Sequence, residues 1–568
     1  MIIGIDLGTT NSLVAVWADG KSTIIPNSLG LNLTPSAVGI NDKGDILIGQ
    51  AAKERQSTHP DSTAVNFKRF MGTDRQIRLG SRSYRPEELS SLVLRSLKAD
   101  AEAFLGEEVS EAVITVPAYF SDAQRKATKI AGQLAGLKVE RLLNEPTAAA
   151  LAYGLHTAER ESKYLVFDLG GGTFDVSILE LFEGMMEVHA STGDNQLGGT
   201  DFTQFLVDYF IKNKLADLGV AADSVPPELI QRLQIKAEKV KREIGDRGKA
   251  EFSVNWQDKT ASLEINESEF EKLVAPLLER LSRPIKGALR DARVRVEEIS
   301  EIVFVGGATR MPCIRKLATR LFQRFPATGI NPDEVVVHGA AVQAGLKARD
   351  SALNETVLTD VCPYTLGIEV SLGDSGKATP GYFQPIIERN NYIPVSRVER
   401  FYTLSDKQKY VNVRIYQGEN PLVKDNIFLG ELKVQVPLAE AGAESIDVRF
   451  TYDINGLLEV VVTVISTGES YSTVIEENPG VLSAEEIKKR LKNLDALKIH
   501  PRDLQENIVV MHRAERLYSE LLGEDRDRLQ RIIAQFISIL DRQDPREIDN
   551  ARKDFVTVLD GIEGAYRF

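Results

Sequence analysis

The sequence predicts a multidomain protein: a two-lobed α/β domain, then a β-sandwich, then a short bundle of helices. Strand-like and helix-like segments alternate as far as about residue 350, which is typical of an α/β domain. Period-two apolar runs with turn signals follow up to about residue 474, and helical signals begin near residue 482. At 568 residues the chain is too long for one hydrophobic core. We therefore expect separate domains in this order.

The predicted α/β domain contains one short motif twice, at Ile5–Thr10 and Phe167–Thr173. Each copy follows an apolar run and places an aspartate before a glycine turn and a threonine. Glycine lets backbone N–H groups point at an anion, threonine adds hydroxyl donors, and aspartate can hold the water molecules of Mg²⁺. Facing each other across a cleft, the two turns would bind a metal-bound polyphosphate. Taken singly, each motif also fits a simple tight turn between a strand and its hairpin partner.

A third strand followed by a turn and a helix is predicted at Ile302–Gly307, which completes the α/β domain at residues 1–350. Residues 351–360 are mostly polar and are typical of an interdomain linker. Four period-two runs between residues 410 and 465, the last two separated by the hairpin signal Asn455-Gly456, predict a β-sandwich over 361–480. A capping box at Ser483–Glu486 opens a predicted helical region over 481–568.

Composition and charge exclude several classes of protein. The net charge of −13 argues against non-specific binding to nucleic acid. The two cysteines, Cys313 and Cys362, cannot form a disulfide framework and lack the spacing of zinc ligands. No apolar stretch approaches the roughly 18 residues that cross a membrane, and Met1 is followed directly by strand-like residues. We expect a cytoplasmic protein without nucleic-acid or membrane partners.

Five motifs, taken in order, resemble those of the seventy-kilodalton heat-shock chaperones, the DnaK-like family. They occupy residues 5–12, 116–120, 144–154, 168–175 and 305–312. The resemblance covers essentially the whole chain, and three further segments most resemble the specialised bacterial HscC branch: residues 358–367, 385–390 and 452–460. It implies an actin-like first domain, a peptide-binding sandwich and a helical lid. It also implies ATP hydrolysis that drives binding and release of client polypeptides.

The resemblance assigns roles to residues around the two turns. Asp6 and Asp168 would hold hydrated Mg²⁺, with K⁺ as a further candidate ion. The expected phosphate-side contacts are Asp6, Gly8, Thr9, Thr10, Asp168, Gly170, Gly171, Gly172, Gly198 and Gly199. The expected nucleoside contacts are Glu238, Lys241, Arg242, Gly306, Gly307, Arg310 and Asp333. Without the resemblance, Glu238, Lys241 and Arg242 would be interpreted as the ion-paired surface of an exposed helix.

Four residues would carry the hydrolysis. Lys68 would neutralise charge on the γ-phosphate, and Thr173 would lie close to it. Glu145 and Asp175 would position or deprotonate the attacking water. Without the resemblance, Lys68 would be interpreted as an ordinary solvated lysine and Glu145 as a structural residue.

The remaining implied sites concern peptides and partners. Seven sandwich residues would form the peptide groove. The pocket residues, each of which also fits ordinary sandwich core, are Ile368, Phe401, Val411 and Val413. Ser371 and Leu404 match the arch over the peptide, with Tyr402 beside them. Arg141 and Asp360 match positions that couple to a J-domain co-chaperone, whereas an exposed arginine and a linker aspartate are otherwise merely solvated. The protein is expected to act as a monomer.

The sequence departs from the family pattern at several positions. Gly245 replaces a serine at the adenine edge, and the lost hydrogen bond would weaken binding by about 1 kcal/mol. Thr200 stands where glutamate is usual, and Tyr402 replaces a small residue, which predicts a narrower and more selective groove. Residues 72–86 and 246–262 form short segments. We therefore expect nucleotide release that is fast or independent of a conventional exchange factor.

Two other functions share the predicted fold of the first domain. A sugar kinase or filament protein does not explain the whole segment after Asp360. A non-hydrolysing exchange factor of the enlarged chaperone type is disfavoured because Lys68, Glu145, Thr173 and Asp175 are all present. The sequence therefore favours an ATP-hydrolysing chaperone with unfolded or specific clients.

Overall fold

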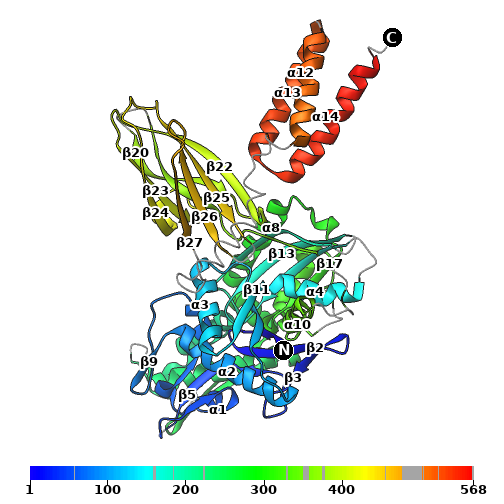
Figure 1. Cartoon of the computed structure of the whole chain (residues 1–568). Helices are drawn as coiled ribbons and strands as arrows, with labels where there is room; N and C mark the ends of the chain where they lie inside the picture. Colours follow the sequence, from blue (N-terminus) through cyan, green and yellow to red (C-terminus); the bar gives the residue numbers. More distant parts are fainter. Residues whose placement is uncertain are drawn as a thin grey trace. The chain divides into compact units, whose positions relative to one another are not determined.

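Figure 1 shows the chain as a computed structural model, coloured along the sequence. The structure describes residues 1–565 except 42, 57, 158–161, 183–184, 222–223, 328–330, 349–352, 354–356, 374–377, 454–455, 476–501, 503–504 and 522. The chain divides into two compact units, one of Met1–Tyr364 with Glu388–Ile393 and one of Thr365–Ile387 with Pro394–Phe568. The predicted capping box, Asn455 and half of the predicted linker lie outside the described residues.

The first lobe of the larger unit is built on a sheet ordered β11-β10-β1-β2-β3, with β4 paired to β2. Its strands are β1 (Ile2–Asp6), β2 (Asn11–Ala18), β3 (Lys21–Ile25), β4 (Thr34–Pro35), β10 (Glu111–Val116) and β11 (Lys138–Asn144). Strand β1 runs parallel to β10 but antiparallel to β2. Helices α2 (Pro86–Leu105) and α3 (Asp122–Leu134) contribute apolar residues to one cluster with β1 and β2.

The second lobe is built on a sheet ordered β17-β12-β13-β14-β18-β21. Its strands are β12 (Ser162–Leu169), β13 (Phe174–Phe182), β14 (Met185–Asp194), β17 (Glu301–Val305), β18 (Val357–Val361) and β21 (Tyr392–Ile393). The predicted strand, turn and helix at Ile302–Gly307 are confirmed as β17, the 3-10 helix η5 (Gly307–Arg310) and α9 (Pro312–Phe322).

Both repeated motifs form turns between antiparallel strands. Ile5–Thr10 joins β1 to β2, and Phe167–Thr173 joins β12 to β13. In the second turn Asp168 pairs with Asp175 across the two strands. The hairpin interpretation and the anion-binding interpretation are therefore compatible, because a hairpin turn can also present its N–H groups to a ligand.

Two helices lie between the sheets of the two lobes. Helices α4 (Glu145–Thr157) and α10 (Val335–Lys347) share an apolar cluster with β10 and β12. They approach so closely that a Cβ on Gly339 would lie 1.8 Å from the Ala148 carbonyl oxygen, so this crossing requires glycine. The packing fixes the start of α4, where Glu145 lies.

The remaining elements extend the two lobes. The first lobe adds β5 (Ala37–Ile40), β6 (Ile46–Ile48), α1 (Gln50–Glu54), η1 (Pro60–Ser62), β7 (Thr63–Val65), η2 (Phe67–Phe70), β8 (Ile77–Leu79) and β9 (Arg82–Tyr84). The second adds α5 (Gly199–Lys214), η3 (Leu215–Leu218), α6 (Pro227–Arg247), β15 (Lys249–Trp256), β16 (Lys259–Asn266), α7 (Glu267–Leu273), α8 (Ala275–Ala292) and η4 (Val296–Glu298). Each of the two short segments contributes to a hairpin, β8–β9 or β15–β16.

The smaller unit contains two four-stranded antiparallel sheets, ordered β20-β19-β23-β24 and β22-β25-β26-β27. Their strands are β19 (Leu366–Leu372), β20 (Thr379–Ile387), β22 (Val395–Tyr402), β23 (Tyr410–Gln417), β24 (Ile427–Gln435), β25 (Ser445–Tyr452), β26 (Leu458–Val464) and β27 (Ser470–Ile475), with η6 (Val423–Asp425) before β24. The four predicted strand runs between residues 410 and 465 fall in β23–β26.

Three helices follow among the described residues of this unit: α12 (Gln505–Glu520), α13 (Gly523–Arg542) and α14 (Pro545–Ala565). They pack around an apolar cluster in which the rings of Phe536 and Phe555 are 5.0 Å apart. Across the described ranges of the chain, every helix is too short or too polar to span a bilayer.

Candidate functional site

Four acidic side chains from both lobes lie close to one another, three of them buried and one, Asp6, half-buried. Asp6 ends β1, Asp168 lies near the end of β12, Asp175 lies at the start of β13, and Glu145 begins α4. Burial, followed by the charge of Glu145, raises the pKa of Asp6 to about 7 and the pKa of Asp175 to about 8. The same two causes raise the pKa of Asp168 well above its ordinary value. Since neighbouring buried carboxylates repel one another, this acidic cluster requires positive charge.

The unpaired oxygens of the acidic cluster indicate what kind of cation fits. The Oδ2 atoms of Asp168 and Asp175 are buried without a hydrogen-bond partner, which is costly unless a ligand or water supplies one. Asp6 Oδ1 accepts a hydrogen bond from Thr115 Oγ1 at 3.2 Å. Among the described residues, no three acidic, histidine or cysteine side chains converge for direct metal coordination. The two unpaired oxygens fit a hydrated divalent cation, whose water molecules would donate hydrogen bonds to them.

One protein cation enters the acidic cluster. The Nζ atom of Lys68, which lies in η2, is 3.1 Å from Glu145 Oε1. Only 4 % of the Lys68 side chain is exposed, so this is a buried ion pair and not the solvated lysine that composition alone favours. Asp175 Oδ1 accepts a hydrogen bond from the Tyr119 N–H at 3.1 Å. Thr173 is also buried.

The structure brings the two predicted turns face to face. A Cβ on Gly171 would lie 2.1 Å from Thr10 Oγ1, and a Cβ on Gly172 would lie 2.9 Å from Thr9 Cγ2. Gly171 and Gly172 are therefore required by close approach of the first turn. In the first turn, a Cβ on Gly8 would meet the Asn11 carbonyl oxygen at 2.0 Å.

The Gly198–Gly199 segment is attached to the second turn by backbone hydrogen bonds. The N–H of Gly199 donates to the Gly170 carbonyl, and the N–H of Thr200 donates to the Gly171 carbonyl, both at 2.9 Å. A Cβ on Gly198 would lie 2.4 Å from Gly172 N. This segment, the two turns and the acidic cluster together form one site.

The expected nucleoside residues on α6 contact one another and the same site. Glu238 accepts hydrogen bonds from Lys241 at 2.6 Å and from Arg242 at 3.0 Å. Lys241 also donates to the Gly199 carbonyl at 2.8 Å. Burial alone would raise the pKa of Glu238, but the charge and hydrogen bonds of Lys241 and a bond from Thr203 lower it below its ordinary value. Burial lowers the pKa of Lys241, and Glu238 opposes that shift.

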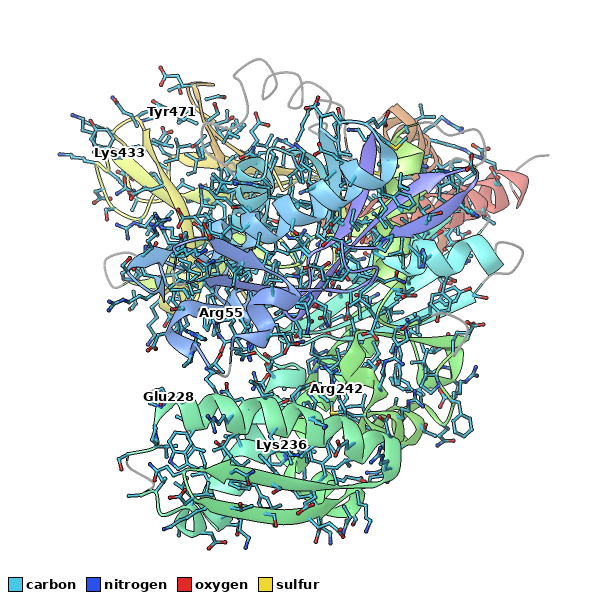
Figure 2. All side chains as sticks on the ribbon, turned by 90° about the horizontal axis from the view of Figure 1, so that it is seen from below. Arg55, Glu228, Lys236, Arg242, Lys433 and Tyr471 are labelled. Carbon is cyan, nitrogen blue, oxygen red and sulfur yellow. The ribbon has the colours of Figure 1, made fainter. Side chains whose placement is uncertain are left out.

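Helix α6 faces α1 of the first lobe. Figure 2 shows Arg242 and Arg55 on sides of their lobes that face each other. Gln56 Nε2 donates to Gln231 Oε1 at 3.0 Å between the two lobes. Burial, followed by the charge of Arg242, lowers the pKa of Lys53 on α1. Arg242 itself is well exposed and able to stack on a planar ligand.

The other expected nucleoside residues lie after β17. Gly306 has a positive φ of 82°, and a Cβ there would be 2.4 Å from the Leu169 carbonyl oxygen. A Cβ on Gly307 would be 2.7 Å from Asp333 Oδ1. Arg310 donates to Asp333 at 2.7 Å. At Gly245, by contrast, a Cβ would have only Pro312 Cδ nearby, at 3.7 Å, so a larger side chain has room.

Comparison with known proteins agrees with this geometry. The family model described as Hsp70 protein matches residues 2–555. The chain belongs to the Hsp70 family. It is 43% identical to the chaperone protein DnaK of Thermotoga petrophila over 528 residues, which is 91% of this chain and 87% of that protein. The chaperone protein DnaK of Thermotoga neapolitana is 42% identical over the same shares.

Family membership establishes the general activity. This Hsp70 protein is an ATP-dependent chaperone that hydrolyses ATP. As in the family generally, it binds ATP and ADP with Mg²⁺, client polypeptides and J-domain co-chaperones. The family also implies an actin-like ATPase domain, a β-sandwich and a helical lid, and the described sheets and C-terminal helices accord with that layout.

The expected peptide-groove residues of the Hsp70 sandwich divide between its two sheets. One sheet carries Ile368, Ser371, Val411 and Val413, and β22 of the other carries Phe401 and Tyr402, with Leu404 just beyond it. Ile368 and Val413 are buried, whereas Ser371, Phe401 and Val411 are half-buried. Tyr402 is 60% exposed and Leu404 is 42% exposed. These two large apolar side chains are available to a ligand.

The coupling residues Arg141 and Asp360 lie in the larger unit, and each is half-buried and hydrogen-bonded. Asp360 Oδ2 accepts a hydrogen bond from Asn144 Nδ2 at 2.6 Å, and Arg141 Nη1 donates to Gln343 at 3.1 Å. Burial raises the pKa of Asp360 and lowers the pKa of Arg141. Our sequence reasoning missed Asn144 itself, although it directly precedes Glu145 in one of the quoted motifs.

Proposed function

We propose that this Hsp70 protein couples hydrolysis at the acidic cluster to docking of its linker, and thereby binds and releases short extended apolar segments of its clients. The observation that carries the proposal is the hydrogen bond between Asn144 and Asp360, at 2.6 Å. Asn144 ends β11, and the next residue, Glu145, pairs with Lys68 in the acidic cluster. One backbone step therefore separates the linker contact from the hydrolytic site.

In the proposed site, Asp6 and Asp168 hold hydrated Mg²⁺, with K⁺ as a further ion. When bound, the cation neutralises phosphate charge. Thr9, Thr10 and the Gly170–Gly172 turn donate hydrogen bonds to the phosphates, and Gly8, Gly198 and Gly199 keep the backbone close to them. The facing turns and the two unpaired aspartate oxygens support this assignment.

Four residues perform the hydrolysis in our proposal. Lys68 neutralises charge that develops on the γ-phosphate, and Thr173 contacts that phosphate. Glu145 and Asp175 position the water and accept its proton. Because burial raises the pKa of Asp175 to about 8, its carboxyl stays protonated near neutral pH until positive charge enters the cluster. With a divalent cation held by Asp6 and Asp168, the pKa of Asp175 would fall, and its carboxylate would so be prepared to act as the base.

The adenosine is held between α6 and the segment after β17. Glu238 and Lys241 contact the ribose side, and Arg242 stacks on the base. The opposite wall consists of Gly306, Gly307, Arg310 and Asp333. The existing Glu238–Lys241–Gly199 contacts support this proposal, because they attach α6 to the phosphate side of the site.

Asp360 is the last residue of the predicted linker and lies in β18 (Val357–Val361). This strand pairs in parallel with β14 and antiparallel with β21. Arg125 Nη2 donates to Asn144 Oδ1 at 2.7 Å, which holds the amide so that it donates to Asp360. We propose that Arg141 and Asp360 transmit the J-domain signal at this point.

We also propose a place in the HscC branch, on the resemblance of residues 358–367, 385–390 and 452–460. Two departures from the family pattern support a specialised client range and independent nucleotide release. Tyr402 is 60% exposed beside the exposed Leu404, so a bulky ring narrows the proposed groove. The β8–β9 and β15–β16 hairpins are short. The hydrogen bond between Gln56 and Gln231, which connects the two lobes, involves no charged group. We propose nucleotide release without a conventional exchange factor, in a cytoplasmic monomer.

The test is binding of the full-length protein to an array of extended apolar peptides, with ADP and with ATP. We expect retention with ADP and release with ATP. Asp360→Ala is expected to retain peptide equally in both states, because it removes the acceptor for Asn144. Asp74→Ala, at a fully exposed aspartate, is the matched control and should behave as the wild type. Equal retention by the wild type in both states would overturn the coupled mechanism.

A further inference from the structure

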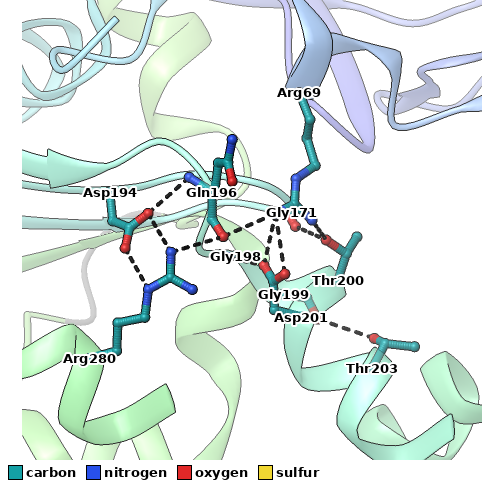
Figure 3. A network of polar contacts seen from close by, with 10 residues as sticks. All are labelled: Arg69, Gly171, Asp194, Gln196, Gly198, Gly199, Thr200, Asp201, Thr203 and Arg280. Carbon is teal, nitrogen blue, oxygen red and sulfur yellow. Dashed lines mark hydrogen bonds and ion pairs between the residues drawn. The ribbon is translucent and has the colours of Figure 1, made fainter. Parts of the chain in front are cut away.

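Arg69 joins the two lobes beside the phosphate turns. It follows Lys68 in η2 of the first lobe, and its guanidinium donates to second-lobe residues 196–201 (Figure 3). Nη1 donates to Thr200 Oγ1 at 2.8 Å, and Nη2 donates to the Gln196 carbonyl at 3.1 Å. Nη2 also donates to the two carboxylate oxygens of Asp201, at 3.2 and 3.3 Å. Three different second-lobe groups thus depend on one first-lobe side chain.

These contacts reach the second phosphate turn by two routes. The Thr200 hydroxyl accepts from Arg69 and donates to the Gly171 carbonyl at 2.9 Å. The stem of Arg69 lies directly against the turn, because a Cβ on Gly172 would be 2.7 Å from Arg69 Cγ. If Arg69 moved, the backbone of the second turn, which faces the phosphates in the proposed site, would therefore move as well.

The acceptor side of these contacts is held in place. Asp201 Oδ2 also accepts from the Gly198 N–H at 2.7 Å, which fixes the start of α5. The Arg69 and Asp201 side chains are 19% and 24% exposed. An ion pair at this depth is screened less by salt than a fully exposed one. The contact therefore connects the two lobes through a partly buried, multiply hydrogen-bonded ion pair.

We propose that Arg69 is a positioning residue that latches the second phosphate turn to the first lobe and sets how long ADP and phosphate stay bound. Products leave only when the lobes separate at the phosphate side, and in many enzymes this opening limits turnover. Breaking the latch is therefore a required part of release. Thr200 connects the latch to the turn through the Gly171 carbonyl.

Arg280 on α8 offers a matched control for this latch. It donates to the two Asp194 oxygens at 2.7 and 2.8 Å and to the same Gln196 carbonyl at 3.4 Å. Figure 3 shows Arg69 and Arg280 approaching the 194–201 segment from different elements. The contacts of Arg280, however, stay inside the second lobe. Its loss removes an arginine–aspartate pair from the same segment without disconnecting the lobes.

The experiment measures stopped-flow release of a fluorescent ADP analogue from the full-length protein with Mg²⁺, chased by excess ATP. We expect Arg69→Gln to speed release about tenfold, which corresponds to roughly 1.4 kcal/mol. Arg69→Lys and Thr200→Val should give intermediate rates, since each keeps part of the latch. Arg280→Gln should stay within about twofold of the wild type. The release rate should change more than the single-turnover hydrolysis rate.

Salt dependence separates the latch from a general loss of stability. Wild-type release should speed up with NaCl because the ion pair weakens, whereas Arg69→Gln should respond much less. A purely structural role would lower the melting temperature and leave this salt dependence intact. Wild-type release rates in both Arg69 variants, or equal acceleration by Arg280→Gln, would overturn the proposal. The result does not depend on client range, because no peptide is present.

Discussion

Removing one buried charge from the acidic cluster should stabilise the nucleotide-free protein at the expense of its function. Asp6 is the clearest case, because burial and then Glu145 raise its pKa from 3.8 to about 7. Asp6→Asn keeps the shape of the side chain and removes the titrating group. We expect this variant to unfold at a higher temperature than the wild type above pH 7, and to bind Mg–ATP more weakly.

The sign and size of the stability difference between Asp6→Asn and the wild type follow from the linkage of folding to proton binding. In the unfolded chain Asp6 loses its proton near pH 4, but in the folded chain it keeps the proton to about pH 7. The folded wild type therefore binds more protons between these values and loses stability as the pH rises. Each pH unit in this interval costs about 1.4 kcal/mol. Between pH 5 and pH 8 the advantage of Asp6→Asn should grow by about 3 kcal/mol and then level off.

The assay is urea unfolding of nucleotide-free protein at pH 5, 6, 7 and 8, followed by the fluorescence of the two tryptophans. Asp74→Asn, at a fully exposed aspartate, is the control and should show no such trend. With saturating Mg–ADP the order should reverse, since the wild type gains more binding energy. An advantage that does not change between pH 5 and pH 8 would refute the reasoning, because the repulsion would then not be electrostatic.

Three further predictions test the site directly. Lys68→Met should cost about 3–5 kcal/mol of stability because it leaves Glu145 buried without its partner. Adding Glu145→Gln should restore much of that stability, as measured by urea titration. Single-turnover hydrolysis by the double variant should nevertheless stay about 10²-fold below the wild type. Gly171→Ala should abolish Mg–ATP binding in calorimetry, since its Cβ would lie 2.1 Å from Thr10 Oγ1; retained affinity would show that the turns do not face each other. Gly245→Ser should tighten ADP binding about fivefold in the same calorimeter, by about 1 kcal/mol, and unchanged affinity would show that the adenine does not lie against α6.

The parts of the site that the sequence predicts are those whose chemistry is local. Each of the two turns contains an aspartate, one or more glycines and a threonine within a few residues. The motif itself therefore indicates a bound anion. The sequence offers the hairpin turn only as an alternative to an anion-binding turn, and the structure shows that the two are compatible. Lys68 could not be assigned from local sequence. No pattern in the neighbouring residues indicates that its side chain is buried, and only the family resemblance selects it.

Contacts between distant residues were missed for a physical reason. Asn144 lies inside a quoted motif, but its partner Asp360 is 216 residues away, and local patterns do not encode which amide meets which carboxylate. Arg69 is similarly separated from Asp201 by 132 residues. Both contacts form only once two sheets and the α4–α10 packing fix the positions of strand ends. Such residues can be expected next to the proposed catalytic residues, as Asn144 adjoins Glu145 and Arg69 adjoins Lys68.

The adjacency of Asn144 and Glu145 also explains how, in the proposed mechanism, the acidic cluster acts on the linker. A coupling between two binding sites typically needs 1–3 kcal/mol of differential free energy. The raised pKa of Asp6 alone indicates a folded state held against about 4 kcal/mol of unfavourable charge near neutral pH, which a cation in the cluster relieves. If only part of that relief reaches Asn144 through Glu145, it suffices to shift the linker between docked and released states. The acidic cluster must therefore be poorly satisfied without its ligand, and substitutions that satisfy it should weaken the dependence of peptide release on nucleotide even where some ATP binding remains.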